Sequence, residues 1–155
     1  MVILEDTRQQ AAKHEAKHEY FASQGIGVVR TKLPFGDYAL WGGKVAVDTK
    51  ANVEEIAANI GGIAHIRFRE ECKLAQYCGG RLVILVENTN GYTCIDDVTT
   101  WVNPNYRKTA RSIDGQRLAK AMHTMSERYG VRFEFCTPEE SGRRVIELLE
   151  AIDGK

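Results

Sequence analysis

The 155-residue sequence has few cysteines, and none in the paired spacing that signals a structural metal or a redox site. No C-x-x-C pair occurs, which excludes a zinc ribbon and a thioredoxin-like motif. We therefore expect ordinary reduced cysteines, most of them buried. The four cysteines are Cys72, Cys78, Cys94 and Cys136.

Long apolar runs are also missing. No stretch approaches the roughly 18 apolar residues that a membrane-spanning helix needs. The first residues turn acidic at Glu5 and Asp6, whereas a signal peptide begins with a cationic segment and continues with an apolar one. The sequence therefore predicts an intracellular, cytoplasmic protein with no membrane segment.

Net charge is absent too, because 21 Lys and Arg residues balance 21 Asp and Glu residues. No overall field draws such a chain to nucleic acid, so local patches would have to hold a nucleic-acid partner. No internal repeat or low-complexity stretch occurs. The length is that of a single domain, 1–155, which can bury about two-thirds of its unfolded surface.

What the sequence does contain is an alternation of strand and helix patterns. The run at 82–86 (LVILV) is apolar and β-branched, as expected of a central strand covered on both faces. Capping boxes at 7–10 and 137–140 predict two helix starts. We therefore expect an α/β fold with a central mixed sheet flanked by helices. The expected strands are 2–4, 26–33, 37–41, 44–48, 82–86 and 131–135, and the expected helices are 7–24, 52–59, 65–77, one before Gly130 and one after Thr137.

Residues 14–18 read HEAKH, the H-E-x-x-H string that on a helix can hold zinc with the glutamate as a general base. Zinc catalysis also needs a third ligand, and no spacing rule points to His65 or His123. Lys17 would place a cation beside the metal. We interpret the stretch as a solvated helix face with charges at helical spacing, and a zinc peptidase is the weaker alternative.

Two aspartates flank a diglycine at Gly42-Gly43, which favours a two-residue hairpin loop because such turns require positive φ. In that hairpin, residues whose numbers sum to 85 face each other, so Asp37 lies opposite Asp48. Opposed Cβ atoms on an antiparallel pair are about 4.5–5.5 Å apart, and like charges there are destabilising. A divalent cation between the two carboxylates would offset this repulsion.

The same register puts Lys50 on the face of both aspartates, because side chains alternate along a strand. Two converging carboxylates, with positions left for water and phosphate, are a usual way of holding Mg²⁺. Lys50 would then orient or deprotonate a metal-bound water, or neutralise charge on the phosphate. The alternative is an exposed hairpin on which Lys50 pairs with both aspartates. The face with the aspartates holds Asp37, Ala39, Trp41, Lys44, Ala46, Asp48 and Lys50, and the face expected in the core holds Tyr38, Leu40, Val45 and Val47.

Asp, a spacer and then Asp-x-Lys is the PD-(D/E)XK nuclease pattern, and more of the chain fits. The ordered segments resemble the nuclease domain of the XPF family of structure-specific endonucleases, which carries GD…ERK…D. The resemblance implies a restriction-endonuclease-like fold and a Mg²⁺- or Mn²⁺-dependent endonuclease that cleaves branched or flapped DNA. It covers 2–87 and, more loosely, 116–150. The matching segments are EDTR at 5–8, LPFGDYAL at 33–40, VDTK at 47–50, IRF at 66–68 and LVILVE at 82–87.

Carried over residue by residue, the resemblance implies a metal site with a catalytic lysine. Asp37 and Asp48 would bind the metal, assisted by the Thr49 carbonyl, and Lys50 would be the catalytic lysine. Glu54 stands where the family has an acidic residue at or near the site. Its simpler alternative is a carboxylate that stabilises a helix N-terminus through the dipole.

Further residues match the edges of the family's site. Asp6 and Arg8 match the D-x-R-E segment, and Arg67 matches a basic residue that the family places near the site. The simpler alternatives are a helix cap for Asp6 and surface charges for Arg8 and Arg67.

The sequence also departs from the family. Gln9 stands where the family has Glu, which removes one acid from the edge of the site. Asp48-Thr49 replaces Glu-Arg, which shortens one ligand and deletes a cation. The departures keep a second hypothesis open, a catalytically decayed nuclease fold that binds DNA or serves as a scaffolding subunit.

A nuclease needs cations that hold the DNA backbone, and aromatic residues there would stack on unpaired bases. A flexible polar loop with solvated charges explains the same residues. Family members usually carry helix-hairpin-helix repeats after the nuclease domain, and this chain reaches Lys155 without them. We therefore expect a stand-alone domain that enlarges its DNA footprint as a homodimer or with a partner subunit. The cations are Arg107, Lys108, Arg111, Arg117 and Lys120, and the aromatic residues are Tyr92, Trp101 and Tyr106.

Overall fold

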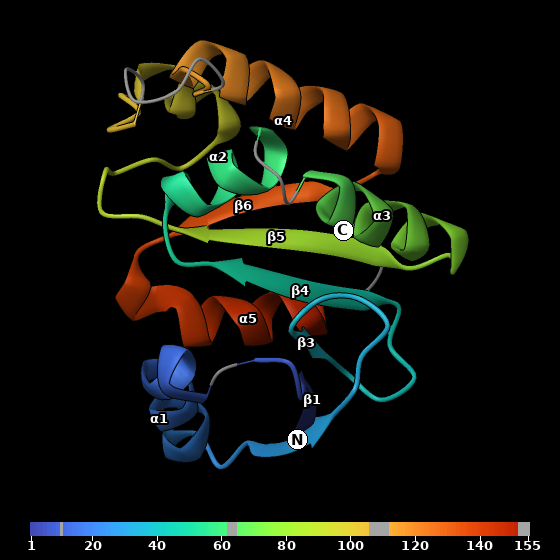
Figure 1. Ribbon diagram of the computed structural model, residues 1–155. Helices are drawn as coiled ribbons and strands as arrows, with labels where there is room; N and C mark the ends of the chain where they lie inside the picture. The colour runs from blue at the N-terminus through green and yellow to red at the C-terminus, as the bar shows by residue number, and fades with distance from the viewer. Residues whose placement is uncertain (10, 62–64, 106–111, 152–155) are drawn as a thin grey trace.

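The computed structural model describes residues 1–9, 11–61, 65–105 and 112–151. Its centre is a mixed six-stranded sheet in the order β2-β1-β3-β4-β5-β6 (Figure 1). The strands are β1 (Val2–Asp6), β2 (Gly27–Thr31), β3 (Tyr38–Ala39), β4 (Val45–Lys50), β5 (Arg81–Glu87) and β6 (Arg132–Cys136).

Strand direction brings three strand ends together. β1 and β2 run parallel, and so do β4, β5 and β6, while β3 is antiparallel to both β1 and β4. β1 therefore points the same way as β4 and β5, and these strands end at the same edge in Asp6, Lys50 and Glu87. Open α/β sheets bind ligands beyond the carboxyl ends of their strands, so this edge is where a site is expected.

Helices cover both faces of the sheet (Figure 1). Three pack on one face, together with η2 (Ile95–Thr100), and two pack on the other. The first group is α2 (Val53–Gly61), α3 (His65–Tyr77) and α4 (Gly115–Tyr129), and the second is α1 (Glu15–Ser23) and α5 (Ser141–Glu150). The remaining short helices are η1 (Ala11–His14) and η3 (Pro138–Glu140).

The central strand is buried on both faces, as its composition predicts. Ile84 and its like-facing neighbours pack under α2, α3 and α4, and Leu85 faces α1 and α5. Helix α3 has the predicted bounds, and the capping box of Thr137 and Glu140 is formed. Within the described ranges, no helix is long and apolar enough to cross a membrane.

The first helix begins later than predicted. It was expected from residue 7, but α1 begins at Glu15, after η1. Residue 7 is still held by the sheet, because the Thr7 amide donates to the Thr31 carbonyl at 3.2 Å and Arg30 donates to the Thr7 and Gln9 carbonyls. Gln10, the other end of the expected capping box, lies outside the described residues.

The register of the hairpin is the predicted one, although the loop is longer. Tyr38 pairs with Val47 and Ala39 with Ala46, but the strands are separated by residues 40–44 rather than by two glycines. Gly36 keeps this register close, because its φ is +75° and an added Cβ would lie 2.8 Å from the Ala46 Cβ. Only glycine fits there without moving the neighbouring strand.

Two predictions about exposure are wrong in part, one on the aromatic residues expected to stack on bases and one on the cysteines expected to be buried. Trp101 does not serve as a stacking platform, because it is 5% exposed and packs in the core beside Val98. Only half of the cysteines are buried: Cys72 and Cys136 are, whereas Cys78 and Cys94 are exposed.

Candidate metal and nucleic-acid site

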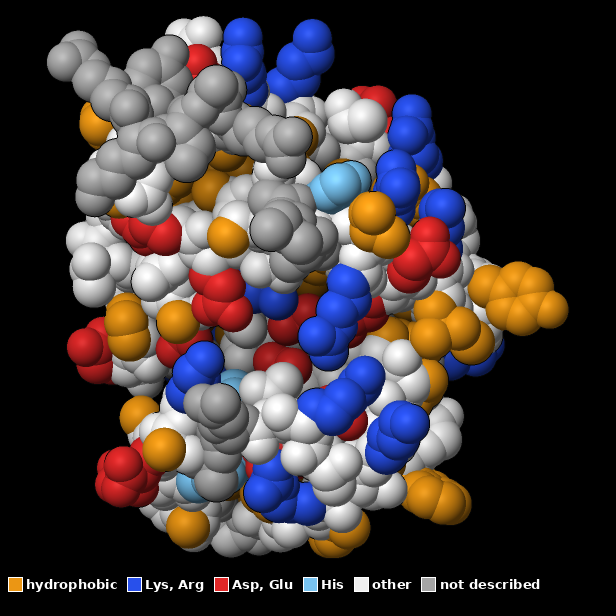
Figure 2. Space-filling model, in the orientation of Figure 1, with side chains coloured by type: hydrophobic (Ala, Val, Ile, Leu, Met, Phe, Trp, Pro, Cys, Tyr) orange, Lys and Arg blue, Asp and Glu red, His pale blue; other side chains and the backbone are white. Residues whose placement is uncertain are grey.

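A cleft of about 490 Å³ opens at the edge where β1, β4 and β5 end. Figure 2 shows acidic side chains at the bottom of a hollow in this face, with lysine and arginine side chains around it. The residues that line the cleft include Asp6, Arg8, Gln9, His14, Lys17, Gly36, Asp37, Asp48, Thr49, Lys50, Glu55, Asn59, Arg67, Phe68, Glu71 and Glu87.

Asp37 and Asp48 lie at the bottom of this cleft, on the same face of the sheet. Asp37 and Asp48 are 6% and 4% exposed. The Asp37 amide donates to the Val47 carbonyl at 2.8 Å. Asp37 Oδ2 accepts hydrogen bonds from Thr49, from its amide at 2.8 Å and from its hydroxyl at 2.9 Å. The two aspartates both line the cleft, but the paired residues of the hairpin begin at Tyr38 and Val47, and Asp37 lies just before them.

Lys50 reaches into the same cleft. Its Nζ lies 3.3 Å from Asp48 Oδ1, donates to Asn59 Oδ1 at 3.4 Å and sits 5.6 Å from the Phe68 ring centroid. The lysine and both aspartates are buried, so the alternative of an exposed hairpin is wrong. The buried cluster combines two carboxyl groups with one ammonium group.

Burial shapes the protonation of this cluster. Burial raises the pKa of Asp48 well above its usual value, and the nearby Asp37 raises it further. Burial also raises the pKa of Asp37 to about 6, against the hydrogen bonds from Thr49 and the charge of Lys50. Burial lowers the pKa of Lys50, but the surrounding carboxylates, Asp48 foremost, together outweigh it and the net shift is upward. The cluster is therefore one positive charge short of compensating two ionised aspartates.

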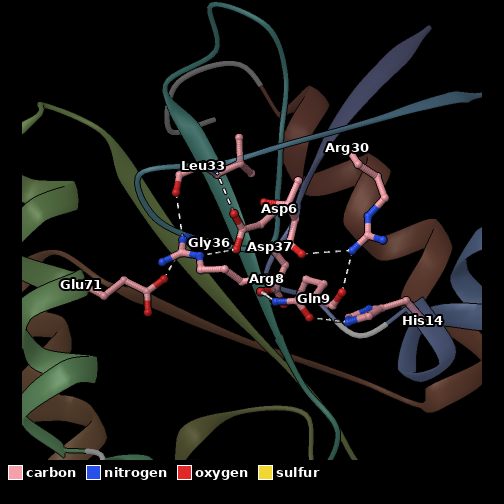
Figure 3. A network of polar contacts seen from close by, with 10 residues as sticks. Asp6, Arg8, Gln9, His14, Arg30, Leu33, Gly36, Asp37 and Glu71 are labelled. Atoms are coloured by element: carbon pink, nitrogen blue, oxygen red, sulfur yellow. Dashed lines mark hydrogen bonds and ion pairs between the residues drawn. The ribbon is translucent and has the colours of Figure 1, made fainter.

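Asp6 and Arg8 hold the loop that leads to Asp37 (Figure 3). Asp6 accepts from Arg8 Nε at 2.7 Å and from the Leu33 amide at 2.9 Å, and Arg8 Nη2 donates to the Leu33 carbonyl at 2.9 Å. Asp6 is buried, whereas the Arg8 side chain is 47% exposed at the cleft. Asp6 therefore anchors a loop instead of capping a helix.

Four acidic residues that line the cleft were not predicted: Glu55, Glu70, Glu71 and Glu87. Glu71 accepts from the Gly36 amide at 2.8 Å, directly before Asp37 in the chain (Figure 3). Glu55 lines the cleft, whereas Glu54, the predicted residue, is exposed and lies outside it. Glu55 and Asn59 are four residues apart on α2 and share a face, and this spacing is the signal that identifies them.

A chain of side chains leads from Asp37 into the protein. Gln9 Nε2 donates to Asp37 Oδ1, and Gln9 Oε1 accepts from His14 Nε2 at 2.5 Å (Figure 3). His14 Nδ1 accepts from the Tyr38 hydroxyl at 2.9 Å. Burial lowers the pKa of His14 to about 4, so the imidazole is neutral at pH 7. The histidine therefore orients the Gln9 amide.

The HEAKH stretch is not a solvated helix face, which corrects the prediction. His14 and Lys17 are 4% and 5% exposed. Lys17 Nζ lies 3.1 Å from Glu87 Oε2, and His18 Nε2 donates to Glu5 Oε2 at 2.5 Å. Across the described parts of the chain, no group of three or more His, Cys, Asp or Glu residues is placed to hold a metal ion. The stretch joins α1 to the ends of β1 and β5.

The predicted nucleic-acid contacts are only partly described. Arg67 lies at the cleft. Arg107, Lys108 and Arg111 lie outside the described residues, as does Tyr106.

Comparisons with known proteins identify the fold. No protein-family model matches the chain, and no curated protein matches its sequence. The solved structure of XPF from Aeropyrum pernix matches with a TM-score of 0.64 and 20% identity, covering 100% of this chain and 63% of that chain. XPF from Aeropyrum pernix in complex with DNA matches with a TM-score of 0.65 and 21% identity, covering 96% and 62%. The predicted fold, a mixed sheet flanked by helices as in XPF, is confirmed, and the chain spans less than two thirds of the chains it matches.

Proposed function

We propose that this chain, on its XPF-like fold, is a metal-dependent endonuclease that hydrolyses phosphodiester bonds in branched or flapped DNA. The observation that carries the proposal is the buried cluster of Asp37, Asp48 and Lys50 at the bottom of an open cleft. Two facing carboxylates, a lysine and a solvent-open side are the components that phosphodiester hydrolysis requires. Cleavage of branched and linear DNAs with Mg²⁺ or Mn²⁺, beside an Asp48 variant, tests it.

The residues present fit a divalent cation. Burial raises the pKa of both aspartates, repulsion by Asp37 raises that of Asp48 further, and a bound cation would supply the missing positive charge. Asp37 and Asp48 would hold Mg²⁺ or Mn²⁺ together with the Thr49 carbonyl, since oxygen ligands suit these ions. The bound ion would supply Lewis acidity and lower the pKa of a bound water.

The chain's own side chains would position and neutralise the phosphate. Lys50 keeps its proton, because its pKa is raised, and its ammonium group would offset charge that develops on the phosphate. Arg67 and Arg8 lie at the cleft and would contact flanking phosphates. Asp6 would act through Arg8 by fixing its guanidinium.

Metal binding should depend on pH. Protonated carboxyls must ionise before they bind a metal, so the stabilisation by Mg²⁺ should grow as pH rises through about 6, the pKa of Asp37. Without metal the sign reverses. The folded state holds a proton on Asp37 that the unfolded state has already lost, so the contribution of Asp37 to stability falls between about pH 4 and 6. At pH 8 and 100 times Kd, Mg²⁺ should raise Tm by about 5–10 °C.

The measurement is a set of thermal melts with Mg²⁺ and with EDTA at pH 5 and pH 8. The double variant Asp37→Asn/Asp48→Asn is the control and should show no shift with Mg²⁺ at either pH. An equal shift at the two pH values in the native protein would contradict the assignment of these carboxylates.

A second candidate function is a DNA-binding or scaffolding subunit without catalysis. The observation that favours it is Gln9, whose amide donates to Asp37 Oδ1 and so occupies one oxygen of the carboxylate. A neutral amide also adds no negative charge to attract a cation. In this case the cleft would still bind DNA through its cations.

Gln9→Glu discriminates between the two candidates. The substitution places a third carboxylate beside Asp37, so we expect tighter Mg²⁺ binding and a lower Tm in EDTA. The Mg²⁺-dependent rise in Tm should increase by several degrees, measured by thermal melts over a Mg²⁺ titration. Gln24→Glu, at the exposed end of α1, is the matched control and should leave the rise unchanged.

We propose further that the protein acts in the cytoplasm on DNA, as a homodimer or with a partner subunit. A single domain without net charge binds DNA weakly, which favours this arrangement.

A further inference from the structure

A second groove, of about 390 Å³, lies between α2, α3 and α4 beside the cleft. We call it the α4 groove. Its walls come from the ends of α2 and α3 and from one side of α4. The residues that line it are Asn59, Ile60, His65, Phe68, Arg69, Arg117, Lys120, Ala121, Thr124, Met125, Arg128 and Tyr129.

The α4 groove concentrates positive charge, although the chain as a whole has no net charge. Its lining includes four Lys and Arg residues and, among the residues described, no Asp or Glu. Figure 2 shows Lys and Arg side chains gathered over α4 at the upper right. In the part of the chain that the structure describes, no ion pair joins these four cations to a carboxylate: Arg69, Arg117, Lys120 and Arg128.

The floor of the α4 groove is apolar. Ile60, Met125 and Tyr129 are only partly buried and pack against the core through one side, so their other side is accessible. Arg69 Nε is buried and has no hydrogen-bond partner. A ligand with anionic groups would match the cations of the groove, and flat apolar surfaces on the same ligand would match its floor.

The α4 groove continues the cleft. Asn59 and Phe68 line both, and both contact Lys50, at 3.4 Å and 5.6 Å respectively. A strand with a phosphate at Asp37, Asp48 and Lys50 would therefore cross Asn59 and Phe68 and enter the α4 groove. The two sites are successive parts of one path.

We propose that the α4 groove binds the unpaired strand of a branched DNA, next to the bond to be cut. Unpaired bases have exposed faces that stack on aromatic and apolar side chains, while their phosphates pair with Lys and Arg. A duplex keeps its bases stacked inside, so we expect it not to enter the α4 groove. This inference rests on the proposed nuclease function and identifies what would make its substrate branched.

The test measures binding of fluorescent DNA by anisotropy in EDTA, so that no cleavage occurs. The probes are a duplex with one unpaired dT arm and the same duplex without the arm. The variant Arg117→Ala/Lys120→Ala removes two exposed cations from the α4 groove. The matched control is Lys44→Ala/Arg81→Ala. It removes two exposed cations at the starts of β4 and β5, at the other end of these strands from the cleft.

For the forked probe, the groove variant should lower the slope of log K against log salt by about 1.4, since each contact with a single strand contributes about 0.7. Its affinity for the plain duplex should stay within twofold of the native protein, as should the affinity of the control for both probes. Tyr129→Leu should weaken binding of the forked probe by about fivefold or more, because it removes stacking. It should leave the slope of log K against log salt unchanged, because the charge is kept.

The inference would be overturned if the groove variant lost equal affinity for forked and plain DNA. It would also be overturned if the groove variant and the control lost equal affinity for the forked probe. Unchanged binding of the forked probe by the groove variant would overturn it as well. Failure of the proposed nuclease function would look different: the native protein would not cleave branched DNA with Mg²⁺ or Mn²⁺, whatever the binding measurements show.

Discussion

Asp48→Asn is expected to reduce Mg²⁺-dependent cleavage of forked DNA by about 10³-fold, in line with the loss of a group that stabilises transition-state charge. The substitution keeps the shape of a buried side chain and removes one of the two aspartate carboxylates at the bottom of the cleft. Asn offers one neutral oxygen, which binds a hard divalent ion less well than a carboxylate. Initial cleavage rates with Mg²⁺ and with Mn²⁺ measure the effect.

The same variant should not be less stable in EDTA. Asp48 is a buried acid with a pKa raised by burial and by Asp37, so its removal relieves repulsion; Lys50 loses its ion pair with Asp48, but the charge of Asp37 still acts on it. Chemical denaturation at pH 8 should give an unfolding free energy equal to or above that of the native protein. Cleavage at the native rate by a fully folded variant would remove Asp48 from the site.

Lys17→Met is expected to lower the free energy of unfolding by about 3–5 kcal/mol, the cost of leaving one partner of a buried ion pair uncompensated. The side chains of Lys17 and Glu87 are 6% and 11% exposed and 3.1 Å apart, and they join α1 to the end of β5. Met matches the length of the lysine stem but leaves the Glu87 carboxylate without its partner. Urea denaturation at pH 7 measures the loss.

A double-mutant cycle separates the loss of the pair from the loss of packing. Lys17→Met/Glu87→Leu removes both charges and should recover most of the stability, because no unpaired charge remains. Lys13→Met, at an exposed residue four positions before Lys17, should change stability by about 0.5 kcal/mol or less. A loss in Lys17→Met no larger than that in Lys13→Met would show that the pair contributes nothing.

The core of the site could be predicted because it depends on local geometry. Strand alternation and the diglycine bend were enough to place Asp37, Asp48 and Lys50 on one face, and the observed register is the predicted one. The longer loop at 40–44 did not change the register, since the paired residues still sum to 85. The apolar run of β5 and the bounds of α3 were likewise fixed by composition and capping.

Residues whose place depends on packing between layers could not be predicted. HEAKH reads as a charged surface because its pattern is local, whereas its burial comes from contact with β1 and β5. Matching by letters selected Glu54, but the start of α2 at Val53 turns Glu55 toward the cleft instead. Glu71 was missed because its partner, the Gly36 amide, lies 35 residues away in the sequence.

The shortness of β3 has a consequence for motion. Its two residues and the neighbouring Asp37 hydrogen-bond to both β1 and β4, and the cleft has walls on both sides of this junction. Outside the sheet, the Lys17–Glu87 ion pair also links α1 to the end of β5. A DNA strand bound in the cleft would contact both sides and restrain the junction, so amide exchange at Tyr38 and Ala39 should slow on adding DNA.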